Sequence, residues 1–539
     1  MNQLPRQNSQ LNGTGLGNDP NRIHSSNLDK ISYDYPWIPD RQDGTYCNPI
    51  ICADYPDPDV IRVATDFYMT ASSFNCAPGL PILHSHDLVN WTIINHAVKN
   101  LPHPRYRDVQ HGCGIWAPAM RFQAGKFWIF FAMPDEGIFL TTADDPAGKW
   151  SEPHLVEPGC GLIDPCPLWD DDGRAYLVHA YARSRAGIKD ILRVRPMAPD
   201  GSRLLGEGKV IFHAPEKHPT IEGPKFYKRH GWYYIFAPAG GVQSGWQVVL
   251  RARSVFGPYE DKTVLHQGNT SINGPHQGGL VELETGQSWF IHFQDAGVYG
   301  RIVHLQPVTW KDDWPLIGTD QNNDGIGEPV LRFPKPKVAR VAPVTVPQTS
   351  DEFDSPTLGL QWHWQANYHD NWAALTARQG WLRLYAQPAK HKNLANVPNL
   401  LLQKFPARAF AAETLVEPGP GRIWLETGLV VTGRSSAAIA LQTTDGNTTI
   451  VFRRNESCTP VKRLDSNKVR FRVEVAEGGL CKFSFASANG DFEPVEHFFQ
   501  AEPGIWVGAK VGIYAISIDS GPSRYADFDY FRFAAPTRP

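Results

Sequence analysis

The sequence lacks the features that mark nucleic-acid-binding and membrane-spanning proteins. Lys and Arg total 52 against 55 Asp and Glu in 539 residues, so there is no basic excess to attract a polyanion. No stretch approaches the roughly 20 apolar residues of a membrane span, and the first 30 residues contain no apolar run resembling a signal. We therefore expect a soluble protein without nucleic-acid or membrane partners, cytoplasmic as written or exported after loss of a signal.

Cysteine is also scarce, whereas aromatic residues are abundant. The eight cysteines include no CxxC pair, which argues against a zinc cluster, and they are too few for a disulfide scaffold. We expect most of them to be free and buried. Phe, Trp and Tyr make up 12% of the chain, including 17 Trp, which suits either a rich core or platforms on which sugar rings stack.

One hairpin pattern occurs five times between residues 57 and 291. Each copy has a short apolar strand, a polar turn and a second strand carrying Tyr or Trp. The aligned aromatic residues are separated by 60, 48, 58 and 55 residues: Tyr68, Trp128, Tyr176, Tyr234 and Trp289. A period near 50 with several short strands per unit is typical of β-propeller blades. The pattern therefore predicts a five-bladed β-propeller.

The first residue of each copy lies 11 to 13 residues before its aromatic residue, in what we call the front position. The front positions hold Asp57, Ala117, Asp164, Glu222 and His276. If the first strand of each blade is innermost, these side chains converge on one mouth of the central channel. Asp-Pro alone is a frequent turn starter, but three carboxylates in equivalent positions of a radial repeat indicate a functional site.

Converging carboxylates without a dense metal-ligand motif suit general acid and base catalysis, of which glycoside hydrolysis is the leading case. The inverting reaction places the acid and the base roughly 6.5–9.5 Å apart to admit a water molecule. Residues on blades across a channel fit that spacing better than the roughly 5 Å of a retaining pair. A sugar-binding propeller without catalysis is the alternative, although such a protein needs no triple of acids.

Several segments resemble glycoside hydrolase family 43, whose members are five-bladed propeller enzymes that act on pentose sugars by inversion. The resemblance covers about residues 46–335 and is carried by NPIICADYPDPDVIR, GIWAPAM, LIDPCPLWDDDG, TIEGPKFYKRHGWYY and GPHQGG. It implies that Asp57 is the general base that activates water. It further implies that Glu222 is the general acid and that Asp164 orients this acid and raises its pKa.

The resemblance also implies substrate and ion contacts. His276 corresponds to a channel histidine beside a water-coordinated cation, commonly calcium, with a hydrogen-bonded core histidine as the alternative. Arg301 in GVYGRIVHL corresponds to the arginine that binds the innermost sugar, with a surface salt bridge as the alternative. Phe74 and Trp116 resemble aromatic residues that wall the pocket, although either also suits a plain core. The chemistry requires no cofactor, and the calcium would be structural.

Other acidic residues are interpreted as structural. Asp54 and Asp59 flank the expected base but do not occupy the front position. The segment DQNNDG at 320–325 fits the start of a calcium loop, but its twelfth position is Leu331 rather than Glu. We therefore predict a polar turn there.

The second half of the chain has a different sequence pattern from the first half. Residues 334–350 are Pro-rich without periodicity and are predicted to be a linker. Residues 351–539 contain closely spaced alternating runs such as KVRFRVEVA, which predict an antiparallel β-sandwich. The segment DEFDSPTLGLQWHW resembles the opening of the sandwich in one family 43 branch, where a sandwich loop helps close the pocket; an independent carbohydrate-binding module is the alternative. Residues 1–40 are predicted to be poorly ordered and residues 41–333 to form the propeller.

These observations together predict an all-β enzyme, a five-bladed β-propeller followed by a β-sandwich. We expect an exo-acting, inverting glycosidase that releases terminal β-D-xylosyl or α-L-arabinofuranosyl units from xylan-type or arabinoxylan-type oligosaccharides, leaning toward β-xylosidase. An endo-arabinanase of the same fold is the competitor within the class, but it needs an open cleft that a pocket-closing sandwich would obstruct.

Overall fold

The computed structural model describes residues 35–340, 342–421, 423–464, 467–522 and 524–536. The N-terminal extension predicted over 1–40 therefore lies outside the described residues, apart from 35–40. Helices are short: α2 (Arg183–Ala186), η2 (Pro104–Arg107), η3 (Gly297–Tyr299), η4 (Asp370–Trp372) and η5 (Leu394–Asn396). No helix within the described ranges is long and apolar enough to cross a membrane.

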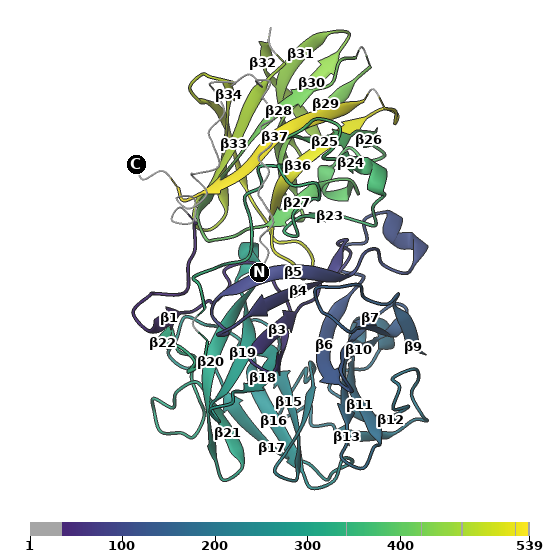
Figure 1. The fold of residues 1–539 in the computed structure, drawn as a ribbon, viewed down its shortest axis with the longest axis vertical. Coiled ribbons are helices and arrows are strands. Elements are labelled where there is room, and N and C mark those ends of the chain that lie inside the picture. Colours follow the sequence, from purple (N-terminus) through teal and green to yellow (C-terminus); the bar gives the residue numbers. More distant parts are fainter. Residues whose placement is uncertain (1–34, 341, 422, 465–466, 523, 537–539) are drawn as a thin grey trace, which may run out of the picture. The chain divides into compact units, whose positions relative to one another are not determined.

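Five four-stranded antiparallel sheets, blades 1 to 5, follow one another along the first part of the chain (Figure 1). In every blade the strands are hydrogen-bonded in chain order. Their bounds are β2 (Asp59–Val63), β3 (Asp66–Thr70), β4 (Gly79–Ser85) and β5 (Trp91–Val98) in blade 1; β6 (Trp116–Gln123), β7 (Lys126–Met133), β8 (Gly137–Ala143) and β9 (His154–Pro158) in blade 2; β10 (Leu162–Trp169), β11 (Ala175–Tyr181), β12 (Leu192–Met197) and β13 (Lys209–Phe212) in blade 3; β14 (Lys225–Arg229), β15 (Trp232–Ala239), β16 (Trp246–Ala252) and β17 (Glu260–Leu265) in blade 4; and β18 (His276–Glu282), β19 (Ser288–Asp295), β20 (Arg301–Lys311) and β21 (Trp314–Ile317) in blade 5.

The first strands of the blades contact one another around the propeller axis. Strand β2 contacts β18 and β6, β6 contacts β10, and β10 contacts β14. The first strand of each blade is therefore innermost, as the front-position argument required. The predicted five-bladed β-propeller is confirmed.

The five aligned aromatic residues all lie on the second strand of a blade, which confirms the repeat. Their rings pack against aromatic rings of the next structural unit: Tyr68 on Phe127 at 5.1 Å between centroids, Trp128 on Trp169 at 5.3 Å, Tyr176 on Phe256 at 5.6 Å, Tyr234 on Trp310 at 5.5 Å and Trp289 on Tyr46 at 6.3 Å. Such edge-to-face and tilted pairs are favourable contacts between large apolar surfaces. The sequence period therefore marks the contacts that hold neighbouring blades together.

Short segments before the first blade and after the last one close the ring. Strand β1 (Thr45–Cys47) pairs with β22 (Arg332–Pro334) in antiparallel register. The Asn48 side chain donates to the carbonyl oxygens of Leu305 and Val330, both at 2.8 Å, and accepts from the Leu305 N–H at 2.8 Å. These buried bonds join the start of the propeller to its last blade.

The strands after residue 360 form two antiparallel sheets, with one short parallel pair between β26 and β36. One sheet contains β23 (His363–Trp364), β27 (Leu401–Lys404), β36 (Lys510–Ser517), β29 (Leu425–Thr432), β30 (Ser436–Thr444), β31 (Asn447–Arg454) and β32 (Ser457–Leu464), with β26 (Gln387–Pro388) beside β36. The other contains β24 (Ala373–Ala374), β25 (Leu382–Tyr385), β37 (Tyr525–Ala534), β28 (Phe410–Pro418), β33 (Val469–Val475), β34 (Leu480–Ser487) and β35 (Glu493–Gln500).

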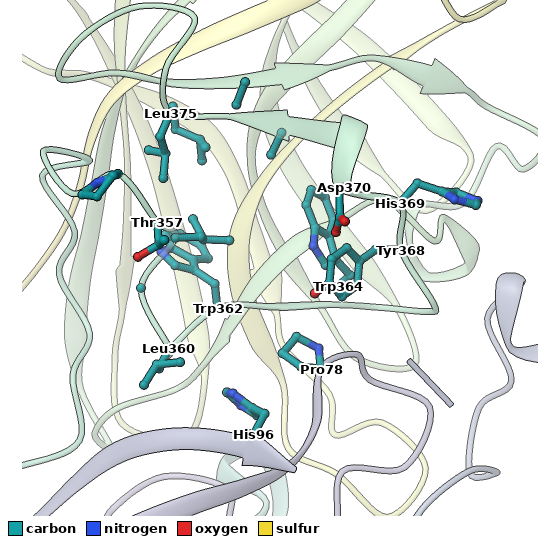
Figure 2. A pocket seen from close by; sticks show the side chains of 16 residues that line it. Pro78, His96, Thr357, Leu360, Trp362, Trp364, Tyr368, His369, Asp370 and Leu375 are labelled. Carbon is teal, nitrogen blue, oxygen red and sulfur yellow. The ribbon is translucent and has the colours of Figure 1, made fainter. Parts of the chain in front are cut away.

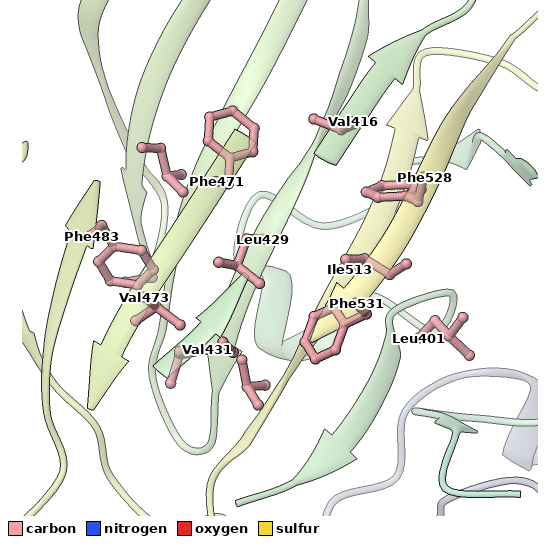
Figure 3. Close-up of a cluster of buried hydrophobic side chains, with 14 of the residues drawn as sticks. Leu401, Val416, Leu429, Val431, Phe471, Val473, Phe483, Ile513, Phe528 and Phe531 are labelled. Carbon is pink, nitrogen blue, oxygen red and sulfur yellow. The ribbon is translucent and has the colours of Figure 1, made fainter. Parts of the chain in front are cut away.

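The inner faces of the two sheets form one apolar core (Figure 3). Strand β33 shows why the sequence folds this way, because Val469, Phe471, Val473 and Val475 are buried while the residues between them are partly exposed. A period of two places alternate side chains on opposite faces of a strand. The predicted β-sandwich is confirmed.

Of residues 335–350, those that the structure describes (all but 341) form no helix or strand, and they contact blade 1. Lys335 forms an ion pair with Asp40 at 2.6 Å, and the Gln348 side chain makes hydrogen bonds of 2.9 and 3.0 Å with the backbone of Ile93 in β5. This connection is therefore fixed to the propeller by specific contacts.

The structure also shows the state of the cysteines and of the segment 320–325. All eight cysteines are unpaired, as expected, but only four of them are buried. The segment 320–325 is a polar turn, as predicted, in which the Gly325 N–H donates to Asp320 at 3.0 Å and the Asp324 N–H to Asn322 at 3.1 Å.

Candidate active site

The innermost strands of three blades bring the three predicted acids together. Asp57 lies two residues before β2, Asp164 lies near the start of β10, and Glu222 precedes β14. Asp164 accepts a hydrogen bond of 2.7 Å from the N–H of Gly223, the neighbour of Glu222. Burial and the charges of Glu222 and Asp57 all raise the pKa of the Asp164 carboxyl group.

A left-handed residue recurs at the start of the first strand in every blade. The residues and their φ angles are Asp57 (52°), Ala117 (28°), Asp164 (56°), Gly223 (59°) and Gln277 (30°). Each lies four residues before the cross-strand partner of the aligned aromatic residue. Irregularities of this kind re-aim side chains and are concentrated at functional sites.

The cross-strand register shows that two of the five front positions were assigned one residue too early. Asp57, Ala117 and Asp164 occupy equivalent positions, but Glu222 and His276 each lie one residue before the equivalent position in their blades. Hairpin length does not cause this offset, because the blade of Glu222 has the same partner-to-aromatic interval as that of Asp57, and the blade of His276 the same as that of Asp164. The range of 11 to 13 residues used to align the copies was wide enough to admit the preceding residue. Counting from the cross-strand partner removes the error.

Asp57 is held from two sides. Its Oδ2 accepts a hydrogen bond of 2.6 Å from Ser72 Oγ, and its Oδ1 accepts one of 2.7 Å from Arg301 Nη1. The Asp57 and Arg301 side chains are only 8% and 9% exposed. Arg301 therefore forms a buried ion pair with the expected base and not a surface salt bridge, and its contact with the sugar stays a prediction.

Asp164 holds a proton more tightly than an exposed aspartate does. Burial is the main cause of its raised pKa, and the charge of Glu222 adds to it, whereas the hydrogen bond from Gly223 and the charge of Lys225 oppose it only in part. The folded protein therefore favours the protonated form of Asp164 beside Glu222.

Glu222 is the accessible member of the trio. Its side chain is 28% exposed, and Oε1 lies 3.3 Å from Nε2 of the buried His276. His276 Nδ1 has no hydrogen-bond partner among the described residues. His276 thus contacts the expected acid directly, and its free nitrogen fits a water molecule.

The environment of His276 offers no protein cage for calcium. Ca²⁺ takes six to eight oxygen ligands, and His276 belongs to no described group of three His, Cys, Asp or Glu ligand atoms. These residues therefore fit a cation only through its water shell.

The two aromatic residues predicted to wall the pocket lie next to each other, and a third aromatic residue that the sequence motifs did not reveal lies beside them. Phe74 is 2% exposed, and its ring lies 6.1 Å from that of Trp116, whose Nε1 has no described partner. Trp506, in the sandwich loop between β35 and β36, lies 6.3 Å from the Trp116 ring, with the Arg301 guanidinium 5.7 Å from its own ring centre. The only local signal is a large aromatic residue in the Gly- and Pro-containing segment EPGIWVG.

Asp54 links this loop to the propeller. Its Oδ1 accepts a hydrogen bond of 2.8 Å from the Arg301 N–H, and its Oδ2 accepts one of 2.9 Å from the Gly508 N–H. Asp59 forms a buried ion pair of 2.8 Å with Arg121. Both aspartates are structural, as interpreted from the sequence, and Asp54 positions the backbone of Arg301 and the loop that carries Trp506.

A separate cavity of about 500 Å³ is lined by Pro78 and His96 of blade 1 and by sandwich residues between 356 and 382 (Figure 2). Its walls are mostly apolar and aromatic and include Trp362 and Trp364. None of the predicted catalytic residues lines this cavity, so it is distinct from the site of the three acids.

A five-bladed propeller that presents three carboxyl groups at its axis, one with a strongly raised pKa, defines a propeller-type glycoside hydrolase. Residues 46–315 match the sequence profile of glycosyl hydrolases family 43, and residues 350–534 match that of the beta xylosidase C-terminal concanavalin A-like domain. The chain belongs to glycoside hydrolase family 43.

Full-length relatives agree with this assignment. The chain is 39% identical over 498 residues to a putative beta-xylosidase of Xylanibacter ruminicola, covering 91% of each chain. It is 30% identical over 537 residues to a non-reducing end alpha-L-arabinofuranosidase of Bacteroides ovatus, covering 91% of this chain and 94% of the relative. The solved structure of the Bacteroides ovatus xyloglucan PUL protein GH43B superimposes with a TM-score of 0.78 at 26% identity, covering 91% of this chain and all of that one.

Proposed function

We propose that this protein is an exo-acting, inverting glycosidase that releases terminal β-D-xylosyl or α-L-arabinofuranosyl units from xylan-type or arabinoxylan-type oligosaccharides, with β-xylosidase as its main activity. The observation that carries the proposal is the difference between the three carboxyl groups. Asp57 is fixed by Arg301 and Ser72, Asp164 is buried with a raised pKa, and Glu222 is accessible. The names of the full-length relatives support the substrate class.

In this mechanism Glu222 donates a proton to the glycosidic oxygen as the bond to the anomeric carbon breaks. A water molecule attacks that carbon from the opposite face and loses a proton to Asp57, so the sugar leaves with inverted configuration. Exchange with solvent then returns the proton from Asp57 to Glu222. Asp164 accepts the hydrogen bond from the N–H of Gly223 and thereby fixes the backbone beside Glu222.

Two contacts support exo-action rather than an endo-arabinanase. Asp54 ties the sandwich loop to the backbone of Arg301, and Trp506 of that loop lies against Trp116. A loop held at the site restricts it to a pocket for a chain end, whereas an endo-enzyme needs a groove open on both sides. The same contacts favour a pocket-closing sandwich over a separate binding module.

A pair of carboxyl groups is sufficient for this chemistry, so the proposal assigns no catalytic cofactor. A hydrated calcium ion in the channel would be contacted by His276 through water and would contribute positive charge near Glu222.

The test compares wild type with Glu222→Ala on xylobiose and on 4-nitrophenyl β-D-xyloside. General acid catalysis contributes roughly 10²- to 10⁴-fold, and 4-nitrophenolate needs little protonation to leave. We therefore expect a loss of that order in kcat/KM on xylobiose and a much smaller loss on the aryl xyloside. Glu284→Ala is the matched control, since Glu284 lies at the surface with a side chain 57% exposed.

Equal losses on both substrates would contradict the acid role of Glu222. A wild-type protein that binds pentosides but cleaves none would favour the non-catalytic propeller. Proton NMR of the first product supplies an independent check, because inversion releases α-xylose from a β-xyloside. The ratio of kcat/KM on aryl β-D-xyloside to that on aryl α-L-arabinofuranoside tests the preference for xylose.

A further inference from the structure

A histidine pair and an aspartate meet on blade 1, away from the three acids. Asp66 begins β3, His84 lies in β4, and His86 follows the end of that strand. The register pairs Tyr68 with His84 and Phe67 with Ser85, which places Asp66 opposite His86. Side chains two residues apart share a face of a strand, so all three groups lie on one face of the blade.

Their ligand atoms converge. Asp66 Oδ1 lies 2.7 Å from His84 Nε2 and 2.9 Å from His86 Nδ1. The two imidazole rings are perpendicular, with centroids 4.6 Å apart. His86 Nδ1 makes no well-directed hydrogen bond with any described residue, although it lies this close to Asp66. Among the described residues, this is the single group of three His, Cys, Asp or Glu ligand atoms this close together.

We propose that Asp66, His84 and His86 form a Zn²⁺ site with a fourth position open to water. Imidazole nitrogens with one carboxylate are typical zinc ligands, whereas calcium and magnesium prefer all-oxygen sites. Ligand atoms in a tetrahedral zinc site are about 3.3 Å apart, since zinc–nitrogen bonds are about 2.0–2.1 Å long. The present distances are shorter by a few tenths of an ångström, so small side-chain rotations admit the ion.

The site is separate from the catalytic centre. Asp66 pairs with Val63 at the far end of β2, whereas Thr70, at the other end of β3, pairs with Asp59 next to the base. The five residues of β3 therefore separate the two places by roughly 14 Å along the strand. Zinc bound there would join β3 to β4 and stabilise blade 1 without taking part in hydrolysis.

The test uses full-length protein treated with EDTA and titrated with ZnCl₂ by isothermal calorimetry. We expect one ion per chain with a dissociation constant in the micromolar range and a rise in Tm on adding ZnCl₂. His84→Ala and His86→Ala should each weaken binding at least tenfold, and Asp66→Asn should do so while keeping the size of the side chain. His391→Ala, which removes an exposed histidine of the sandwich, is the matched control and should bind as wild type does.

Unchanged stoichiometry and affinity in His84→Ala and His86→Ala would overturn the proposal, and so would the absence of binding to wild type at millimolar zinc. If an alanine variant does not fold, His86→Gln preserves most of the packing and tests the same ligand. Cobalt(II) provides a second readout, because a site with two imidazoles gives visible absorption that the variants should lose. Hydrolysis of aryl xyloside by the folded variants should match wild type.

Discussion

Replacing Trp506 by alanine tests whether the sandwich domain takes part in binding the sugar. Trp506 is 47% exposed beside Trp116 and Arg301. A tryptophan presents up to about 250 Å², so roughly 120 Å² remains exposed. If a bound sugar covers about half of that area, at ~25 cal/mol per Å², the ring contributes about 1.5 kcal/mol. That free energy corresponds to about a tenfold change in kcat/KM.

The assay is kcat/KM of wild type and Trp506→Ala on xylobiose and on 4-nitrophenyl β-D-xyloside. We expect about a tenfold loss on both, expressed mainly in KM, with little change in Tm because the ring is not part of a core. Phe498→Ala is the matched control, since Phe498 is an aromatic residue of the same domain that is 55% exposed. An unchanged kcat/KM in Trp506→Ala, or an equal loss in Phe498→Ala, would refute the reasoning.

Two further predictions concern buried carboxyl groups. A raised pKa means that the folded state favours protonated Asp164. As the pH rises above about 3.9, the pKa of aspartate in the unfolded chain, Asp164 therefore lowers the free energy of unfolding. Asp164→Asn should therefore be more stable than wild type at pH 7 and lose that advantage toward pH 4 in thermal unfolding, while losing most activity; equal Tm at both pH values would contradict this. Asp54→Ala removes two hydrogen bonds from buried backbone N–H groups to a carboxylate, each worth about 1.5–3 kcal/mol. It should lower the free energy of unfolding in urea by about 3 kcal/mol and reduce kcat/KM, and an unchanged urea midpoint would argue against the positioning role of Asp54.

The repeat made much of the fold predictable. Each blade is built from adjacent hairpins. Its pattern of apolar strands and one large aromatic residue therefore lies within one short stretch of sequence. Because those aromatic residues make the contacts between blades, their period gave the number of blades. The carboxylates followed from the same alignment, since radial symmetry brings equivalent positions of different blades to one axis.

The tertiary structure decided what depends on contacts between distant residues. No repeated pattern in the sequence marks the role of Trp506. The same holds for the hydrogen bond from Gly508 to Asp54, which joins residues 454 positions apart. The one-residue offset of Glu222 and His276 depends on cross-strand register, which turn length alone does not fix. The raised pKa of Asp164 arises from burial and from neighbouring charges on two other blades. The sequence by itself determined which carboxylates are the candidates for the chemistry, because the repeat is local. The three-dimensional packing decided their environments, because burial and electrostatics are properties of the assembled ring.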